Sequence, residues 1–114
     1  MADCLFCKIV SRQIPASIVY EDERILAFND INPQAPTHVL VVPKQHIESL
    51  NVLKGGHDAI VGEIVRRAAA IANERGISAG GYRTVFSTNR DAGQTVFHIH
   101  LHLLGGRPMT WPPG

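Results

Sequence analysis

Three histidines alternate with apolar residues near the end of the chain, in the segment His98-Ile99-His100-Leu101-His102. Successive side chains on a strand point to opposite faces of a sheet. A strand here would carry the three imidazoles on one face and the apolar residues, from Phe97 to Leu103, on the core face. A single histidine on a strand is usually a surface or hydrogen-bonded residue, but three at alternate positions indicate chemistry.

Two kinds of chemistry fit such a row. A strand rises about 3.3 Å per residue, which separates the first and third histidines by about 13 Å. A Zn–N bond is only about 2 Å long, so a single zinc cannot easily take all three rings. Imidazole titrates near neutral pH, and a neutral central ring can attack phosphorus to form a covalent intermediate. The flanking rings would then bind phosphate oxygens and move protons.

The two cysteines, Cys4 and Cys7, form a C-x-x-C pair at the start of the chain. No strand precedes them, whereas a thioredoxin-like redox pair normally follows a strand. A structural disulfide is not expected in a reducing compartment. The pair is therefore interpreted as half of a metal site, provided that further ligands exist.

Periodicity predicts the elements that must position these residues. The clearest is a helix over 58–75, where Ile60, Ile64, Ala68 and Ile71 recur at steps of three or four and Val65 and Ala69 widen the stripe. A short helix is predicted over 4–13 and a proline-rich loop over 32–36. Strands are predicted over 17–21, 24–29, 38–43, 82–88 and 95–104, with a loop over 89–94. Most strands follow one another directly, which favours an antiparallel sheet in a single α+β domain spanning residues 1–114.

Composition narrows the classes of function. The chain has 114 residues, 45% of them apolar and 18% charged, which is the balance of a globular domain and not of a disordered one. A net charge of +1 gives no electrostatic case for nucleic acid or an anionic membrane as a partner. No apolar run approaches the roughly 20 residues that span a bilayer. The first residues lack the pattern of a secretory signal, so a cytoplasmic location is expected.

Several short motifs together resemble one known family. The stretch 98–104 matches the pattern His-φ-His-φ-His-φ-φ, in which φ is apolar, and the other matching segments occur in the same order along nearly the whole chain. On these motifs the sequence resembles the histidine triad (HIT) family, and within it the Hint branch of purine nucleoside phosphoramidate hydrolases. The other segments are Phe28-Asn29-Asp30-Ile31, Ala35-Pro36-Thr37-His38, Pro43-Lys44-Gln45-His46, Gly93-Gln94-Thr95-Val96, Gly105-Gly106-Arg107-Pro108 and Trp111-Pro112-Pro113-Gly114.

The resemblance implies a HIT-like α+β fold, with a five-stranded antiparallel sheet, one long and one short helix per subunit, and a homodimer. It also implies hydrolysis of purine nucleoside 5′-phosphoramidates, such as AMP or GMP linked to an amine, through a covalent nucleotidyl-histidine intermediate. No cofactor is expected in the reaction itself, and neither nucleic acid nor a membrane is expected as a partner.

The resemblance assigns roles residue by residue. His100 matches the nucleophile, supported by His102, His38 and Thr95. Asp30 matches an acidic contact to the ribose. The remaining matches surround the purine, ribose and phosphate: Leu5, Phe6, Ile9, Ile14, Phe28, Ile31, Asn89, Gly93, Gln94 and, from a tail that reaches toward the partner subunit, Trp111.

Some members of the family bind a structural zinc, and the matching ligands here are Cys4, Cys7, His46 and His98. The alternative is a pair of reduced thiols without metal. One alternative function, a nucleotide-binding regulatory or interaction protein, shares every pocket residue. Another alternative is a dinucleoside polyphosphate hydrolase, but the tail Trp111-Pro112-Pro113-Gly114 favours the Hint branch. His102 favours hydrolysis over nucleotidyl transfer, because related transferases carry glutamine at this position. The natural leaving group and the choice between adenine and guanine stay open.

Overall fold

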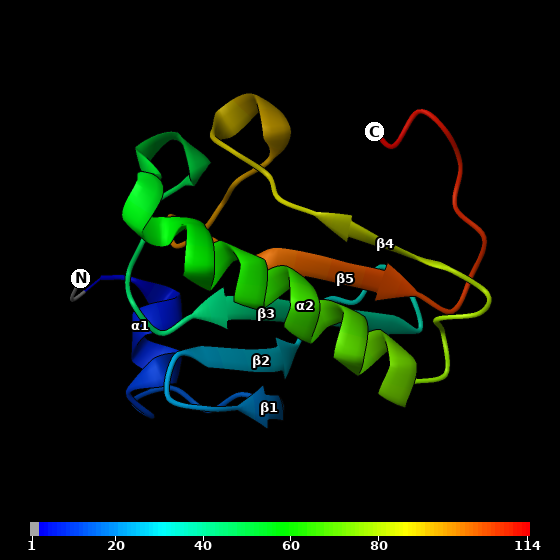
Figure 1. Cartoon of the computed structure of the whole chain (residues 1–114), viewed down its shortest axis with the longest axis horizontal. Helices are drawn as coiled ribbons and strands as arrows, with labels where there is room; N and C mark the ends of the chain where they lie inside the picture. Colours follow the sequence, from blue (N-terminus) through cyan, green and yellow to red (C-terminus); the bar gives the residue numbers. More distant parts are fainter. Residues whose placement is uncertain (1–2) are drawn as a thin grey trace.

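One antiparallel sheet organises the chain (Figure 1). The computed structural model describes residues 3–114. Its five strands lie in the order β1-β2-β3-β5-β4, which confirms the predicted five-stranded antiparallel sheet with one short and one long helix. The elements are α1 (Leu5–Val10), β1 (Ile18–Glu21), β2 (Ile25–Asn29), β3 (Thr37–Pro43), α2 (Asp58–Glu74), β4 (Tyr82–Val85) and β5 (Leu101–Gly105), with short 3-10 turns at Leu50–Val52, Gly55–His57 and Arg90–Ala92.

The long helix α2 covers one face of the sheet and forms the larger core. Figure 1 shows it lying across β3 and β5. The predicted stripe supplies its buried side, and the odd-numbered positions of β3 and β5 face it, as period-two alternation requires. The buried residues of this core include Ile64, Ala68, Ile71 and Ala72 from the helix, and Ala27, Val39, Val41, Leu101 and Leu103 from the sheet.

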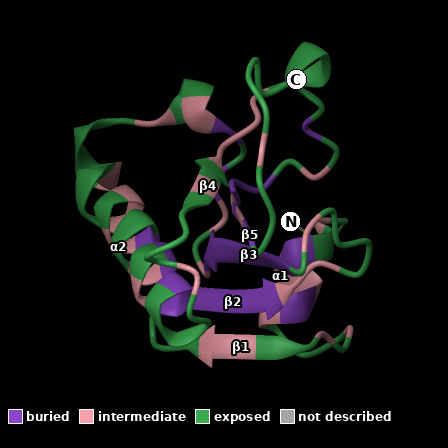
Figure 2. Cartoon of the chain, turned by 90° about the vertical axis from the view of Figure 1, so that its right-hand side faces the viewer, coloured by how far each residue is buried: buried purple, intermediate pink, exposed green. Residues whose placement is uncertain are grey.

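The short helix α1 packs on the opposite face of the sheet. Figure 2 shows α1 and α2 on opposite sides, with the buried strands β2 and β3 between them. Phe6 and Ile9 of α1 pack against the even-numbered positions of β2 and β3, among them Phe28 and Leu40. This second core is small and opens at one end. Side chains of the histidine segment reach the same face.

The final strand is shorter than predicted. It begins at Leu101 and not at residue 95, so His98 and His100 lie in an irregular segment that precedes it. Backbone groups of this segment bond elsewhere: Ile99 N donates to Ile47 O at 2.7 Å, and the Gln94 side chain donates to Val96 O at 3.2 Å. The expected core position of Phe97 is wrong as well, because its side chain is 45% exposed.

Other boundaries differ for related reasons. The strand predicted over 82–88 ends at Val85, which pairs with His102, because β5 offers almost no partner beyond that point. The first helix ends at Val10 and not at 13, since Arg12 adopts a left-handed backbone with φ of 67°. On α2, Val65 is 47% exposed and Ala69 is also exposed, so the buried stripe is narrower than predicted.

Within residues 3–114, no helix is both long and apolar enough to cross a membrane.

Tight packing at the end of β5 gives a first testable expectation. A Cβ added at Gly105 would lie 2.4 Å from Cδ1 of Ile77 and 3.3 Å from Cβ of Tyr82. Overpacking costs about 1–3 kcal/mol, and the flexible end of Ile77 can move whereas Cβ of Tyr82 cannot, so we expect Gly105→Ala to lower the free energy of unfolding in urea by about 1 kcal/mol. Gly80→Ala is the matched control, because a Cβ there meets nothing within 4 Å. Equal stability of the two variants would contradict the packing described here.

Candidate active site

The open end of the smaller core forms a cavity of about 310 Å³, which we call the histidine cavity. Its walls come from α1, the loop that follows α1, the end of β2, the middle of β3 and the segment that leads into β5. The structure brings ten of the predicted site residues to its lining: Leu5, Phe6, Ile9, Ile14, Phe28, Asp30, Ile31, Thr95, His100 and His102.

His100 is held in one orientation by its own chain. Its Nδ1 lies 2.8 Å from the carbonyl oxygen of His98, which can only accept a hydrogen bond. We therefore assign the proton to Nδ1, which leaves the lone pair on Nε2. The Phe6 ring meets the imidazole edge to face, with 5.0 Å between ring centroids. Burial lowers the pKa of His100, so the ring is neutral at pH 7 and can act as a nucleophile.

A hydrogen-bonded chain fixes the proton on His102. The backbone N–H of Gln34 donates to Nδ1 of His38 at 3.0 Å, so His38 carries its proton on Nε2. That nitrogen lies 3.0 Å from Nδ1 of His102, to which it donates. His102 must then carry its own proton on Nε2. Desolvation, reinforced by its two histidine neighbours, lowers the pKa of His102 to about 4.

Asp30 lies between this chain and the cavity. One carboxylate oxygen, Oδ2, is 3.4 Å from Nε2 of His38, and the other accepts a hydrogen bond from the Asn32 N–H at 2.8 Å. Asp30 also lines the histidine cavity, so its carboxylate borders the space predicted for the ribose. The structure thus gives Asp30 a second contact, to His38, that sequence reasoning did not identify.

The apolar part of the cavity contains an unusual exposed residue. Ile31 is 100% exposed, although it stands next to Asp30 at the rim. A flat apolar ligand lying against it would cover apolar surface that the chain itself leaves in water.

Sequence reasoning missed five residues that line the histidine cavity. Leu40 could have been predicted, because it lies two positions from His38 on the same face of β3. The others are Pro15, Ala16, Asn29 and Val96.

Four predicted substrate contacts do not line the histidine cavity. Asn89 and Gly93 lie in the exposed turn before the histidine segment, and Trp111 is 82% exposed in the C-terminal tail. Gln94 is buried, and its amide is occupied by the backbone: Nε2 donates to Glu48 O at 2.9 Å, and Oε1 accepts from Asn89 N at 2.8 Å. In this chain, Gln94 holds the loop that carries Thr95.

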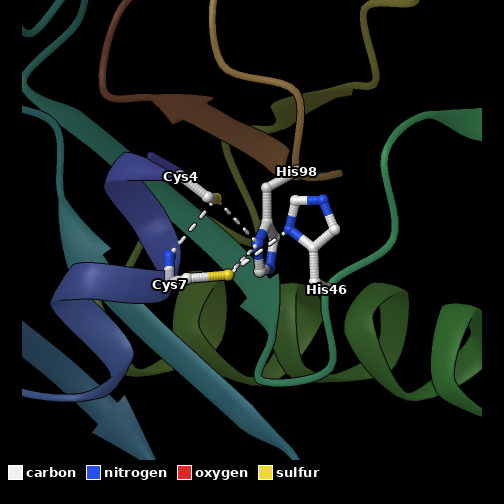
Figure 3. A group of neighbouring side chains, drawn as sticks. All are labelled: Cys4, Cys7, His46 and His98. Carbon is white, nitrogen blue, oxygen red and sulfur yellow. Dashed lines mark hydrogen bonds between the residues drawn. The ribbon is translucent and has the colours of Figure 1, made fainter. Parts of the chain in front are cut away.

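The four predicted metal ligands converge beside the histidine cavity. Figure 3 shows Cys4, which caps the N-terminus of α1, and Cys7, within α1, facing His98 and His46. Their ligand atoms all lie within 4.8 Å of one another, with Sγ of Cys4 3.4 Å from Nδ1 of His98 and Sγ of Cys7 3.3 Å from Nδ1 of His46.

The donor set fits zinc. Two thiolates and two imidazoles form a closed tetrahedral site of the structural kind. Nε2 of His98 donates to the Pro43 carbonyl oxygen at 2.7 Å, which turns the Nδ1 lone pair toward the thiols, as outer-shell partners of zinc ligands do. Without a cation, desolvation and the neighbouring Cys4 raise the pKa of Cys7 to about 11. A bound divalent cation would reverse that effect, because coordinated thiols ionise.

A second group of metal-type donors, Asp30, His38 and His102, also lies within 4.8 Å. Coordination through Nε2 of His38 would require a lone pair there and a proton on Nδ1. The Gln34 N–H already points at Nδ1, so two donors would face each other. This group is a proton chain and does not fit a metal.

A five-stranded sheet that places a buried, neutral histidine beside an apolar cavity defines a small α+β protein equipped for nucleophilic catalysis. Residues 3–111 match the family described as "Scavenger mRNA decapping enzyme C-term binding". The chain is 52% identical to an uncharacterized HIT-like protein of Synechococcus elongatus, over 98% of this chain and 97% of that protein. It is 48% identical to the purine nucleoside phosphoramidase of Escherichia coli, over 94% of this chain and 90% of that protein.

The solved structures agree with these relatives. A HIT family hydrolase from Legionella pneumophila superimposes with a TM-score of 0.97 and is 54% identical, covering 98% of this chain and 100% of that one. A histidine triad protein from Clostridium difficile gives a TM-score of 0.93 at 44% identity, over 96% of each chain. This chain belongs to the histidine triad family.

Proposed function

We propose that this protein hydrolyses purine nucleoside 5′-phosphoramidates to the nucleoside monophosphate and a free amine. The observation that carries the proposal is His100, whose neutral ring is locked with Nδ1 on the His98 carbonyl oxygen and whose Nε2 is free for attack. The name of the Escherichia coli relative, purine nucleoside phosphoramidase, supports the substrate class.

Two displacements account for the reaction. In the first, the Nε2 lone pair of His100 forms a bond to phosphorus while the P–N bond breaks, and the leaving nitrogen takes a proton. In the second, water attacks phosphorus, the bond to His100 breaks and the water proton returns to the enzyme. His102 suits the proton transfer, because its Nε2 carries a proton that it would give to the leaving nitrogen in the first displacement and regain from the attacking water in the second.

The rest of the nucleotide would extend away from this centre. The purine lies in the apolar part of the cavity, between Phe6, Phe28 and the exposed Ile31, and the ribose hydroxyls donate to Asp30. Aliphatic and phenyl groups stack on either purine, so the cavity accepts both AMP and GMP conjugates.

A kinetic screen tests the proposal. AMP and GMP phosphoramidates with several amines are incubated with the protein, and amine release is measured. We expect turnover of all of them, at rates that depend on the amine. Tight AMP binding without turnover of any phosphoramidate would favour a nucleotide-binding regulator instead. Turnover confined to dinucleoside polyphosphates would favour the third candidate, a dinucleoside polyphosphate hydrolase.

The lowered histidine pKa values predict the pH dependence of the reaction. The active form has neutral His100, and burial lowers the pKa of this ring below the usual 6.5, so protonation requires more acid. We therefore expect the midpoint of the acid limb of kcat/KM to lie below pH 6.5, so that more than half of the maximal kcat/KM is kept at pH 6.5. Initial rates corrected for uncatalysed hydrolysis check this expectation. A profile already at half its maximum at pH 6.5 would contradict the assigned environment.

We also propose that Cys4, Cys7, His46 and His98 hold a structural zinc, which ties α1 and its purine-contacting side chains to the sheet. The close approach of the four donors and the orientation of His98 support this assignment. Thiol ligands must stay reduced, which is consistent with a cytoplasmic location.

A homodimer is proposed as well. Its support is the edge strand β4, which pairs only with β5, together with half-exposed apolar side chains that a partner would cover, among them Val65 on α2 and Tyr82 on β4. Sedimentation or scattering at micromolar concentration measures the assembly directly. A monomer under these conditions would contradict this part of the proposal.

A further inference from the structure

A second cavity, of about 480 Å³, adjoins the histidine cavity, and nothing in the reaction described above occupies it. We call it the side cavity. Leu5, Thr95 and Val96 line both cavities, so the two cavities share a wall. Thr95 stands at the border and is exposed.

The geometry of an in-line displacement requires space for the leaving group beyond the phosphorus atom. The nucleoside fills the apolar part of the histidine cavity, and in an in-line displacement the leaving nitrogen lies opposite the attacking Nε2 of His100. Asp30 and the apolar wall already border the nucleoside, so the substituent on that nitrogen needs a separate space. The side cavity is the hollow that shares Thr95 with the reaction centre.

The walls of the side cavity combine apolar and acidic groups. Leu5 and Phe97 are 43% and 45% exposed and present unpartnered apolar surface to it. Two carboxylates, Asp3 and Glu48, also line it, and Cys4 and His46 of the proposed zinc site complete its wall. Within the described residues, the Glu48 carboxylate has no basic partner, whereas Glu21 and Glu63 pair with arginines. A ligand that matches these walls has an apolar stem and a positive charge.

We propose that the side cavity binds the substituent of the amine leaving group and selects amines with an apolar stem and a second, cationic group. The inference rests on the proposed function and narrows its substrate class. In the first displacement the P–N bond breaks and the amine leaves with a proton, still carrying its distal charge beside Glu48. Because the amine departs in that step, selection appears in kcat/KM.

Three adenosine phosphoramidates test the proposal: the unsubstituted amidate, the n-hexylamine amidate and the amidate of one end of 1,5-diaminopentane. The last two have stems of equal length and differ in terminal charge. We expect the diamine conjugate to have the higher kcat/KM at low salt by about fivefold, the size of an exposed ion pair. The ratio should shrink toward one at high ionic strength, because salt screens exposed charges.

Two matched variants assign the effect to this cavity. Glu48→Gln should reduce the diamine-to-hexyl ratio to about one, whereas Glu23→Gln, which removes an exposed carboxylate elsewhere, should keep it. Phe97→Ala should lower kcat/KM for both stem-bearing substrates relative to the unsubstituted amidate.

The outcomes separate the two proposals. A ratio of one in the unaltered protein, or a ratio that survives Glu48→Gln, overturns the side-cavity assignment while hydrolysis of the unsubstituted amidate continues. If none of the three amidates is hydrolysed, the proposed function itself fails, and the side-cavity assignment fails with it.

Discussion

His100→Asn is expected to reduce hydrolysis of adenosine phosphoramidate by at least about 10⁴-fold, because removal of a covalent nucleophile leaves only the binding contribution to catalysis. Asparagine is a smaller polar side chain that can still donate to the His98 carbonyl oxygen, the bond that now orients the ring. The fold should survive, because the side chain packs in the small core beside Phe6 and not in the core under α2.

The matched control is His57→Asn. His57 belongs neither to the proposed zinc site nor to the proton chain of His38 and His102. Its Nδ1 only accepts a hydrogen bond from the Lys54 N–H at 2.9 Å, which an asparagine oxygen can also accept. We expect its kcat/KM to equal that of the unaltered protein. Circular dichroism and AMP binding of His100→Asn verify that the site is intact. A folded, AMP-binding His100→Asn protein with more than a tenth of normal turnover would remove His100 from the role of nucleophile.

Loss of the proposed zinc should have the largest effect on stability. A metal that binds only the folded state stabilises it by about 4 kcal/mol when its free concentration is about 1,000 times Kd. For a chain of this size, 1 kcal/mol corresponds to about 4 °C in Tm, so we expect chelation to lower Tm by roughly 15 °C. Affinity for AMP should fall at the same time, because Cys4 and Cys7 flank Phe6, which lines the histidine cavity.

Cys7→Ser provides the control for that experiment. This variant should start with the lowered Tm and should show no further shift on chelation, since its metal site is already incomplete. Elemental analysis of unaltered protein, purified without chelator, should give one zinc per chain. Zinc-free protein with an unchanged Tm after chelation would show that the four residues meet without holding a metal.

The sequence predicted the order of elements well, because the strong signals are local. The helix over 58–75 has a clear helical period and the strand over 38–43 is rich in β-branched residues, and the structure places them at Asp58–Glu74 and Thr37–Pro43. The structure also places ten predicted residues around one cavity. The resemblance to the histidine triad family, and not periodicity, predicted that residues as distant in sequence as Leu5 and His102 belong to one site.

The errors arose where distant contacts override a local pattern. Residues 95–100 alternate like a strand, but Ile99 N bonds to Ile47 O and the Gln94 amide bonds to Glu48 O, and neither partner can be read from the segment itself. The same is true of the proton chain through His38, which depends on the Gln34 backbone. Such side chain–backbone contacts set the tautomers of the histidines, and with them the chemistry.

The stereochemical course at phosphorus tests the covalent mechanism most directly. An adenosine phosphoramidate made chiral at phosphorus by a sulfur substituent is hydrolysed in oxygen-18 water, and the configuration of the product is determined. Each in-line displacement inverts phosphorus, so attack by His100 followed by attack of water predicts overall retention. Overall inversion would mean that water attacks the substrate directly and would contradict the nucleotidyl-histidine intermediate.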